Sequence, residues 1–190
     1  MALTRKQQRL RLEIEKIASN VSMDHWNIEQ YEPEGRTTFL ELMKDKLVRG
    51  EVISRYTLID EFLTAIICNY YFRRQPKNQS FRRLWKTKQF KIFVHYIMDE
   101  THLLKKLAIV HAIEEVPRDV SSAIARINDV RNALAHSFFP ENRRRYESDK
   151  KVMYLGLHIF TLEGVAAFQD DFQLADNYLM KRAYGVSWVE

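Results

Sequence analysis

Three polar side chains at helical spacing are the residues of this chain best suited to chemistry. In the stretch INDVRNALAHSFFPENRRR (residues 127–145), Arg131, Asn132 and His136 interrupt an apolar pattern that is typical of a helix. Asn132 and His136 are four residues apart and would be neighbours on one helix face. Arg131 lies about 100° further round, toward the edge of the apolar face. An arginine at this edge suits a cleft that holds an anion better than a packed core.

Arginine and histidine together point to the chemistry of phosphate esters. The guanidinium group offers a fixed fork of donors that matches phosphate oxygens. A histidine with an ordinary pKa of about 6.5 takes or gives a proton near neutral pH. The pair could therefore cut an RNA strand, where a 2′-hydroxyl loses its proton while charge builds on phosphorus. The alternative is that His136 only meets the dipole of the helix C-terminus while Arg131 forms a surface ion pair. Spacing alone leaves both interpretations open.

A basic tract that lacks acidic residues precedes this stretch. No Asp or Glu occurs between Glu61 and Asp99, and the same interval holds eight Lys and Arg residues interleaved with aromatic ones. Such a surface attracts nucleic acid through its phosphates and offers rings for base stacking. A solvated basic face over core aromatics is the alternative, and the formal net charge of +5 is a moderate bias only.

Long helices account for the elements that would position these residues. No glycine lies between Gly50 and Gly156, and the intervening sequence is rich in good helix formers. The sequence predicts a helix over 36–72, a loop over 73–80, a helical block over 81–116 that breaks near 99–101, a helix that starts at Pro117 and ends before Pro140, a hairpin around Gly156, and a last helix capped by Thr161. The expected fold is all-α: an antiparallel up-and-down helical bundle with a short hairpin before the last helix. Residues 1–35 are expected to form a basic helical extension, and residues 36–190 the bundle domain.

Several common classes of site are missing from the sequence. The scattered glycines form neither a phosphate-binding P-loop nor a dinucleotide fingerprint, and no His, Cys and carboxylate set has metal-ligand spacing. We therefore expect no cofactor and no metal. The single cysteine, Cys68, lies in an apolar setting and is expected to be a buried thiol. Neither a secretory signal nor a membrane-spanning apolar run is evident, so a cytoplasmic protein is expected.

The sequence segments around Arg131, Asn132 and His136 resemble those of a known family. The segment VRNALAHS (130–137) resembles the Arg-x4–6-His signature of the HEPN superfamily, in the form with Asn directly after Arg. The resemblance extends over roughly residues 50–180. It includes RYTLIDEFLTAIICNYYF before the motif, HLLKKLAIVHAIEEVP leading into the motif helix, and YLGLHIFTLEGVAAFQDD after the loop.

This resemblance implies a metal-independent endoribonuclease whose products carry a 2′,3′-cyclic phosphate and a 5′-hydroxyl. Arg131 would orient the phosphate, His136 would act as general base or acid, and Asn132 would position both by hydrogen bonding. Because the chain has one motif, the resemblance implies a homodimer with a composite active site. The acidic pair Asp60 and Glu61 lies where some relatives place a supporting acid near the motif arginine, and the sequence does not tell which of the two faces inward.

Further basic residues outside the signature are candidates for RNA contact. Arg143, Arg144 and Arg145 directly follow the motif helix, and Arg82, Arg83 and Lys86 belong to the basic tract. We expect them to bind the RNA backbone, and for the three consecutive arginines a solvated loop is an equal alternative.

Relatives of this type are often toxins of toxin–antitoxin systems or antiviral defence effectors, and many pair with a nucleotidyltransferase-like antitoxin. An alternative function is a non-catalytic HEPN-like module that binds RNA or nucleotide, or that scaffolds a partner. A helical adaptor without a polyanion ligand is a third possibility, which the tract without acidic residues disfavours.

Overall fold

The helix predicted over 36–72 forms one long helix of the computed structural model. The structure describes residues 5, 8, 33–72, 86–136 and 152–184. Helix α2 runs over Pro33–Phe72, close to the predicted 36–72. Val52, Ile59 and Leu63 recur at steps of seven and four residues and are buried. Continuing these steps to Tyr70 would predict burial there, but Tyr70 is 55% exposed and Ile67 is buried instead, because the buried face of a helix with 3.6 residues per turn shifts slowly along the sequence.

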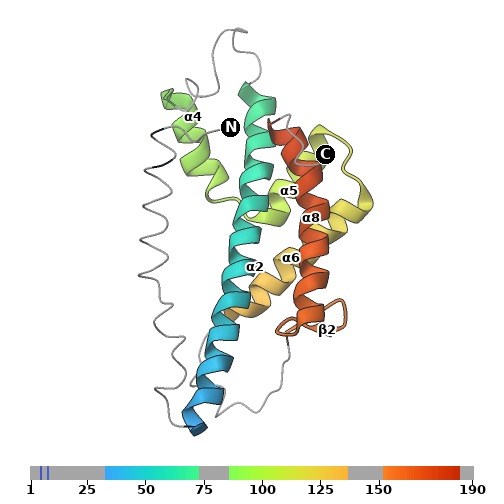
Figure 1. Cartoon of the computed structure of the whole chain (residues 1–190). Helices are drawn as coiled ribbons and strands as arrows, with labels where there is room; N and C mark the ends of the chain where they lie inside the picture. Colours follow the sequence, from blue (N-terminus) through green and yellow to red (C-terminus); the bar gives the residue numbers. More distant parts are fainter. Residues whose placement is uncertain (1–4, 6–7, 9–32, 73–85, 137–151, 185–190) are drawn as a thin grey trace. The chain divides into compact units, whose positions relative to one another are not determined.

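The remaining elements follow the predicted order. They are α4 (Lys88–Phe93), η3 (Val94–Met98), α5 (Leu103–Ile113), α6 (Arg118–His136), β1 (Met153–Tyr154), β2 (Leu157–His158) and α8 (Leu162–Tyr184), drawn in Figure 1. The helical block breaks at 99–102, and α6 starts directly after Pro117, as the sequence predicts, but the block ends at Ile113 and not at 116. The fold is all-α, with one small hairpin before the last helix.

Contacts between helices give their directions. Glu51 accepts a hydrogen bond from Gln169 near the start of α8, and Asn69 donates one to the carbonyl of Ala183 near its end. Helices α2 and α8 therefore run parallel, as Figure 1 also shows. Helix α6 runs antiparallel to α2, because Arg49 contacts Leu134 and Tyr56 contacts Arg131. The predicted up-and-down order of helices is therefore not strict, because α8 runs parallel to α2. The short helices α4, η3 and α5 separate the 40-residue α2 from α6, which runs in the opposite direction.

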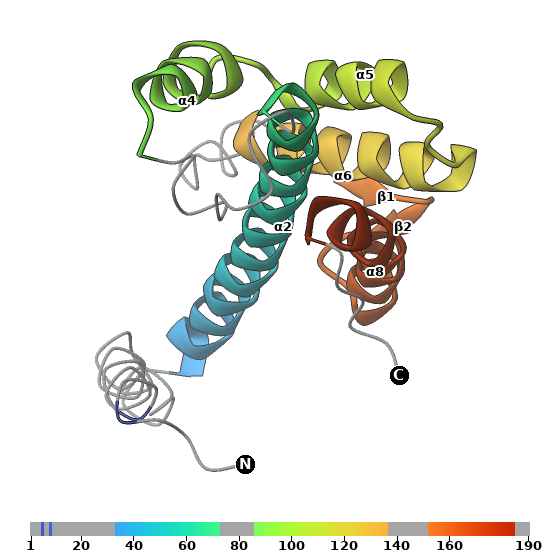
Figure 2. The ribbon, with the colours of Figure 1, turned by 90° about the horizontal axis from the view of Figure 1, so that it is seen from above.

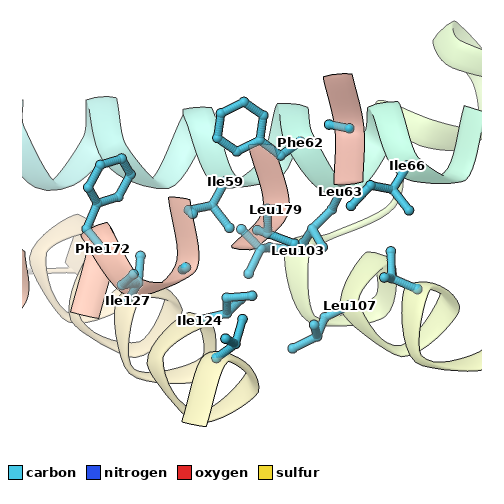
Figure 3. Packing of buried hydrophobic residues seen from close by; sticks show 14 of the residues in the cluster. Ile59, Phe62, Leu63, Ile66, Leu103, Leu107, Ile124, Ile127, Phe172 and Leu179 are labelled. Carbon is cyan, nitrogen blue, oxygen red and sulfur yellow. The ribbon is translucent and has the colours of Figure 1, made fainter. Parts of the chain in front are cut away.

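The core lies where four helices meet. Side chains of α2, α5, α6 and α8 converge in Figure 3: Ile59, Phe62, Leu63, Ile66, Leu103, Leu107, Ile124, Ile127, Phe172 and Leu179. The apolar residues that recur at helical spacing along α6 are all buried: Val120, Ile124, Ile127, Val130 and Leu134. Cys68 is buried as expected, and burial raises the pKa of its thiol to about 11. Burial of this face fixes the rotation of α6, and with it the direction of the neighbouring polar residues.

The hairpin has a two-residue turn, Leu155–Gly156, and pairs Tyr154 with Leu157. Both turn residues have positive φ, 49° and 81°, which is the geometry of a type I′ turn and explains the glycine. Thr161 caps α8 as predicted, accepting a hydrogen bond from the N–H of Gly164 at 3.1 Å. A Cβ on Gly164 would lie 2.2 Å from the carbonyl oxygen of His158, so only glycine lets the hairpin pack this closely on α8.

The chain divides into two compact units, Met1–Lys44 and Asp45–Glu190. The predicted N-terminal extension, residues 1–35, lies almost wholly outside the described residues. All contacts discussed below lie within Asp45–Glu190. No helix in the described part of the chain has the length and apolar character needed to cross a membrane.

Candidate functional site

The motif arginine lies at the edge of the buried face of α6, as its position after Val130 predicts. Arg131 is half-buried, and its Cζ lies 4.9 Å from the centre of the Tyr56 ring on α2. Its Nη1 donates a hydrogen bond to Oδ1 of Asn132 at 3.0 Å, so the first two motif residues contact each other. Among the described residues, no carboxylate forms an ion pair with Arg131. The guanidinium is held by a ring and an amide, and its charge is not neutralised by either.

Tyr56 connects three helices at this point. Its ring lies under Arg131 of α6, and its hydroxyl is near the backbone of Leu103, the first residue of α5. Burial raises the pKa of the Tyr56 hydroxyl, the charge of Arg131 lowers it and the charge of Asp60 raises it, for a net increase. Tyr56 therefore stays a neutral phenol at physiological pH, and it fixes the place of the Arg131 side chain.

The structure separates the two acidic candidates on α2. Asp60 is half-buried and lies one turn after Tyr56, whereas Glu61 is exposed. Oδ2 of Asp60 accepts a hydrogen bond from Nζ of Lys106 at 2.6 Å, and Lys106 is only 3% exposed. Asp60 thus faces inward, next to the site of Arg131, and its ion pair is with a lysine of α5.

Lys106 is a residue that the sequence reasoning missed. It shares the buried face of α5 with Leu103, Leu107 and Val110, at helical spacing. A lysine in such a stripe is unusual, because a buried ammonium needs a charged or hydrogen-bonded partner. That spacing could have identified Lys106, but not its partner on another helix.

His136 is the last residue of α6, one turn after Asn132, and its side chain lies outside the described residues. The end of α6 contacts α2 through Arg49, whose Nη1 donates to the carbonyl oxygen of Leu134 at 2.6 Å. The same guanidinium binds Asp45, with Nε 2.6 Å and Nη2 3.3 Å from the carboxylate oxygens. A cation at this end satisfies an orphan carbonyl and suits the helix dipole. This pair therefore anchors the turn of backbone that carries His136.

A second charged cluster occupies the middle of α6. Nε and Nη2 of Arg126 donate to the carboxylate of Asp171 at 2.6 and 2.7 Å, and the hydroxyl of Tyr154 donates to the same carboxylate at 2.5 Å. Burial raises the pKa of Asp171, but the hydrogen bonds from Arg126 and Tyr154 lower it by more, so the net pKa lies below its ordinary value. This cluster joins α6, the hairpin and α8, and its groups are directed at one another.

The predicted RNA contacts divide between described and undescribed residues. Arg82, Arg83, Arg143, Arg144 and Arg145 lie outside the described residues. Lys86 is exposed, just before α4, and lines a hollow of about 380 Å³ that α4 and η3 form. Lys86 therefore belongs to a different surface from Arg131, which lies between α6 and α2.

Within the described ranges, no three His, Cys, Asp or Glu side chains gather closely enough to hold a metal ion. What the described site offers is a cation fixed against a phenol, an amide beside it, and a helix end that carries a histidine. Such a set can bind a phosphate through Arg131. Comparison with protein-family models, with curated proteins and with solved structures finds no match for this chain. The resemblance to the HEPN superfamily therefore rests on the residues quoted from the sequence.

Proposed function

We propose that this protein is a metal-independent endoribonuclease of the HEPN type. The observation that carries the proposal is the state of Arg131: it is half-buried, fixed over Tyr56 and bonded to Asn132, and among the described residues it has no carboxylate partner. A structural arginine at a helix interface is normally paired with an acid, because an unpaired buried charge is costly. An arginine kept in place without one is suited to an anionic ligand.

The reaction is a transesterification within the RNA strand. A base removes the proton of a 2′-hydroxyl, the 2′-oxygen attacks the adjacent phosphorus, and the bond from phosphorus to the 5′-oxygen breaks. The leaving 5′-oxygen takes a proton, which leaves a 2′,3′-cyclic phosphate and a 5′-hydroxyl. Arg131 stabilises the charge on the phosphate oxygens and Asn132 orients the guanidinium. His136 moves one of the two protons.

A second copy of the chain supplies the other proton-transfer group in this proposal. Acid and base must lie on opposite sides of the reacting phosphate, and one motif provides one histidine. We therefore propose a homodimer with a composite site. The resemblance to the HEPN superfamily extends the proposal to a role as a toxin or antiviral effector in the cytoplasm, with a nucleotidyltransferase-like antitoxin as partner.

The test is an RNA cleavage assay in the presence of EDTA, with analysis of the product ends. The wild type should give cyclic-phosphate ends, and Arg131→Ala and His136→Ala should each lower the cleavage rate by about 10² or more. Two matched controls keep the same side-chain types: Arg118→Ala, an exposed arginine of α6, and His111→Ala, an exposed histidine of α5. Both should cleave like the wild type.

Each failure has a distinct meaning. Equal cleavage by the wild type and both motif variants would contradict the assignment of Arg131 and His136. Salt-sensitive RNA binding without cleavage, across structured and unstructured RNAs, would favour the alternative of a non-catalytic module. Recovery of cleavage on mixing Arg131→Ala chains with His136→Ala chains would support a site shared between two copies.

A further inference from the structure

The hollow formed by α4 and η3 has the composition of a binding surface. Its lining residues are Lys86, Lys88, Lys91, Ile92, His95 and Tyr96. We call it the α4–η3 hollow. It is open to solvent and has a volume of about 380 Å³. In Figures 1 and 2, α4 lies across α2 from α8, away from the helix pair α6 and α8.

The residues that line the hollow include three lysines and no carboxylate. Lys86, Lys88 and Lys91 are exposed, and among the described residues no carboxylate pairs with any of them. The nearest acid along the chain is Asp99, which lies 3.6 Å from Nδ1 of His95 at the end of η3. Three lysines without acidic neighbours attract a polyanion, because binding releases the counterions of its phosphates.

An aromatic ring also lines the hollow. Tyr96 is 69% exposed, and the ring of His95 packs edge-on against it at 4.7 Å. The local helix is widened, since the N–H of Asp99 donates to the carbonyl of Val94, five residues earlier, at 2.9 Å. The exposed ring leaves a flat aromatic face open to a ligand. An unpaired base has a flat face that can stack there.

We propose that the α4–η3 hollow binds single-stranded RNA, with phosphates against Lys88 and Lys91 and a base stacked on Tyr96. The choice of RNA among nucleic acids rests on the proposed function, whereas the charge and the exposed ring are independent of it. An anionic membrane is the main competing partner, because Ile92 and Ile97 are also exposed. The three lysines together with the exposed ring of Tyr96 favour a single strand, since it offers both phosphates and unpaired bases.

The experiment measures binding without cleavage. The probe is a fluorescent single-stranded 2′-O-methyl RNA, which lacks the attacking hydroxyl and so stays intact, and anisotropy is recorded at several salt concentrations. The double variant Lys88→Glu/Lys91→Glu should bind about tenfold more weakly or worse and show a shallower salt dependence. Tyr96→Ala should lose about tenfold, and Tyr96→Phe, which keeps the ring, should bind like the wild type.

The matched control is Lys105→Glu/Lys181→Glu, which makes the same charge change at exposed positions of α5 and α8. An equal loss in this control, or no loss in the hollow variants, would overturn the proposal. Two further results would also overturn it. One is binding of phosphatidylserine-rich vesicles through Lys88 and Lys91 without binding of the RNA, and the other is tighter binding of a DNA strand of the same sequence.

Cleavage of unmodified RNA by the same preparations separates this proposal from the proposed ribonuclease function. Binding through the hollow without any cleavage leaves this inference standing and removes the ribonuclease, whereas motif-dependent cleavage with no effect of the hollow variants does the reverse.

Discussion

Two arginines of α6, five residues apart, occupy opposite kinds of environment. Arg126 donates two hydrogen bonds to Asp171, which also accepts from Tyr154, so every group of that cluster has a charged or polar partner within the protein. Arg131 lies over Tyr56 and bonds only to the amide of its neighbour Asn132, as far as the described residues show. The first arrangement holds three elements together. The second leaves guanidinium donors available to a ligand.

The comparison indicates that Arg126 stabilises the fold, whereas Arg131 is placed to bind a ligand. Asp171 is 9% exposed, so its carboxylate needs Arg126 to compensate for the loss of water. Tyr56 and Asn132 place no such demand on Arg131, because neither carries a charge at neutral pH. The cation–ring contact with Tyr56 and the hydrogen bond to Asn132 fix the direction of the Arg131 side chain but do not neutralise its charge. An arginine prepared for a phosphate has these properties.

The largest expected effect is the loss of Asp171. Asp171→Ala leaves Arg126 without its partner and removes the acceptor of Tyr154, so the free energy of unfolding should fall by about 3 kcal/mol. Urea unfolding followed by circular dichroism measures this change. The adjacent Asp170 is exposed, and Asp170→Ala should change stability by less than about 0.5 kcal/mol. Equal losses in the two variants would show that the cluster around Asp171 does not stabilise the fold.

A smaller effect is expected from acid. Because the folded pKa of Asp171 lies below its ordinary value, the ionised carboxylate stabilises the fold above the unfolded pKa of about 4, and this contribution is lost as pH falls through the folded pKa. The stability difference between the wild type and Asp171→Asn should therefore be constant near neutral pH and shrink below about pH 4. Unfolding midpoints in urea at a series of pH values test this. A difference that grows on acidification would mean that Asp171 is not held by Arg126.

Local sequence patterns predicted the elements well, for a physical reason. Helix α2, the break before α5, the apolar face of α6, the Gly156 turn and the Thr161 cap each depend on residues close together in the chain. The edge position of Arg131 also follows from helical geometry once Val130 is known to be buried. Such features need no knowledge of which helices meet.

The partners of the charged residues could not be predicted in this way. The pairs Asp60–Lys106 and Arg126–Asp171 join residues about 45 positions apart, and they exist because helices pack in one particular register. Helical spacing from Ile59 and Leu63 places Asp60 nearer the buried face of α2 than Glu61, but only the packing of α5 against α2 supplies its partner Lys106. The wide turn of η3 has no sequence signature either. The basic character of the tract before Asp99 was evident from composition, but the hollow that gathers its lysines was not.

The smallest expected effect on stability is that of Arg131, and it is the sharpest test of the comparison. Arg131→Ala removes a cation–ring contact and a hydrogen bond to a half-buried amide, so the free energy of unfolding should fall by about 1 kcal/mol or less. Arg126→Ala, the same truncation on the same helix, should cost more, because it leaves the carboxylate of Asp171 buried without a cation. Parallel urea titrations of the two variants give the ratio of their losses in unfolding free energy. Equal destabilisation would make Arg131 a structural residue like Arg126, and the phosphate-binding role proposed for it would then lose its physical basis.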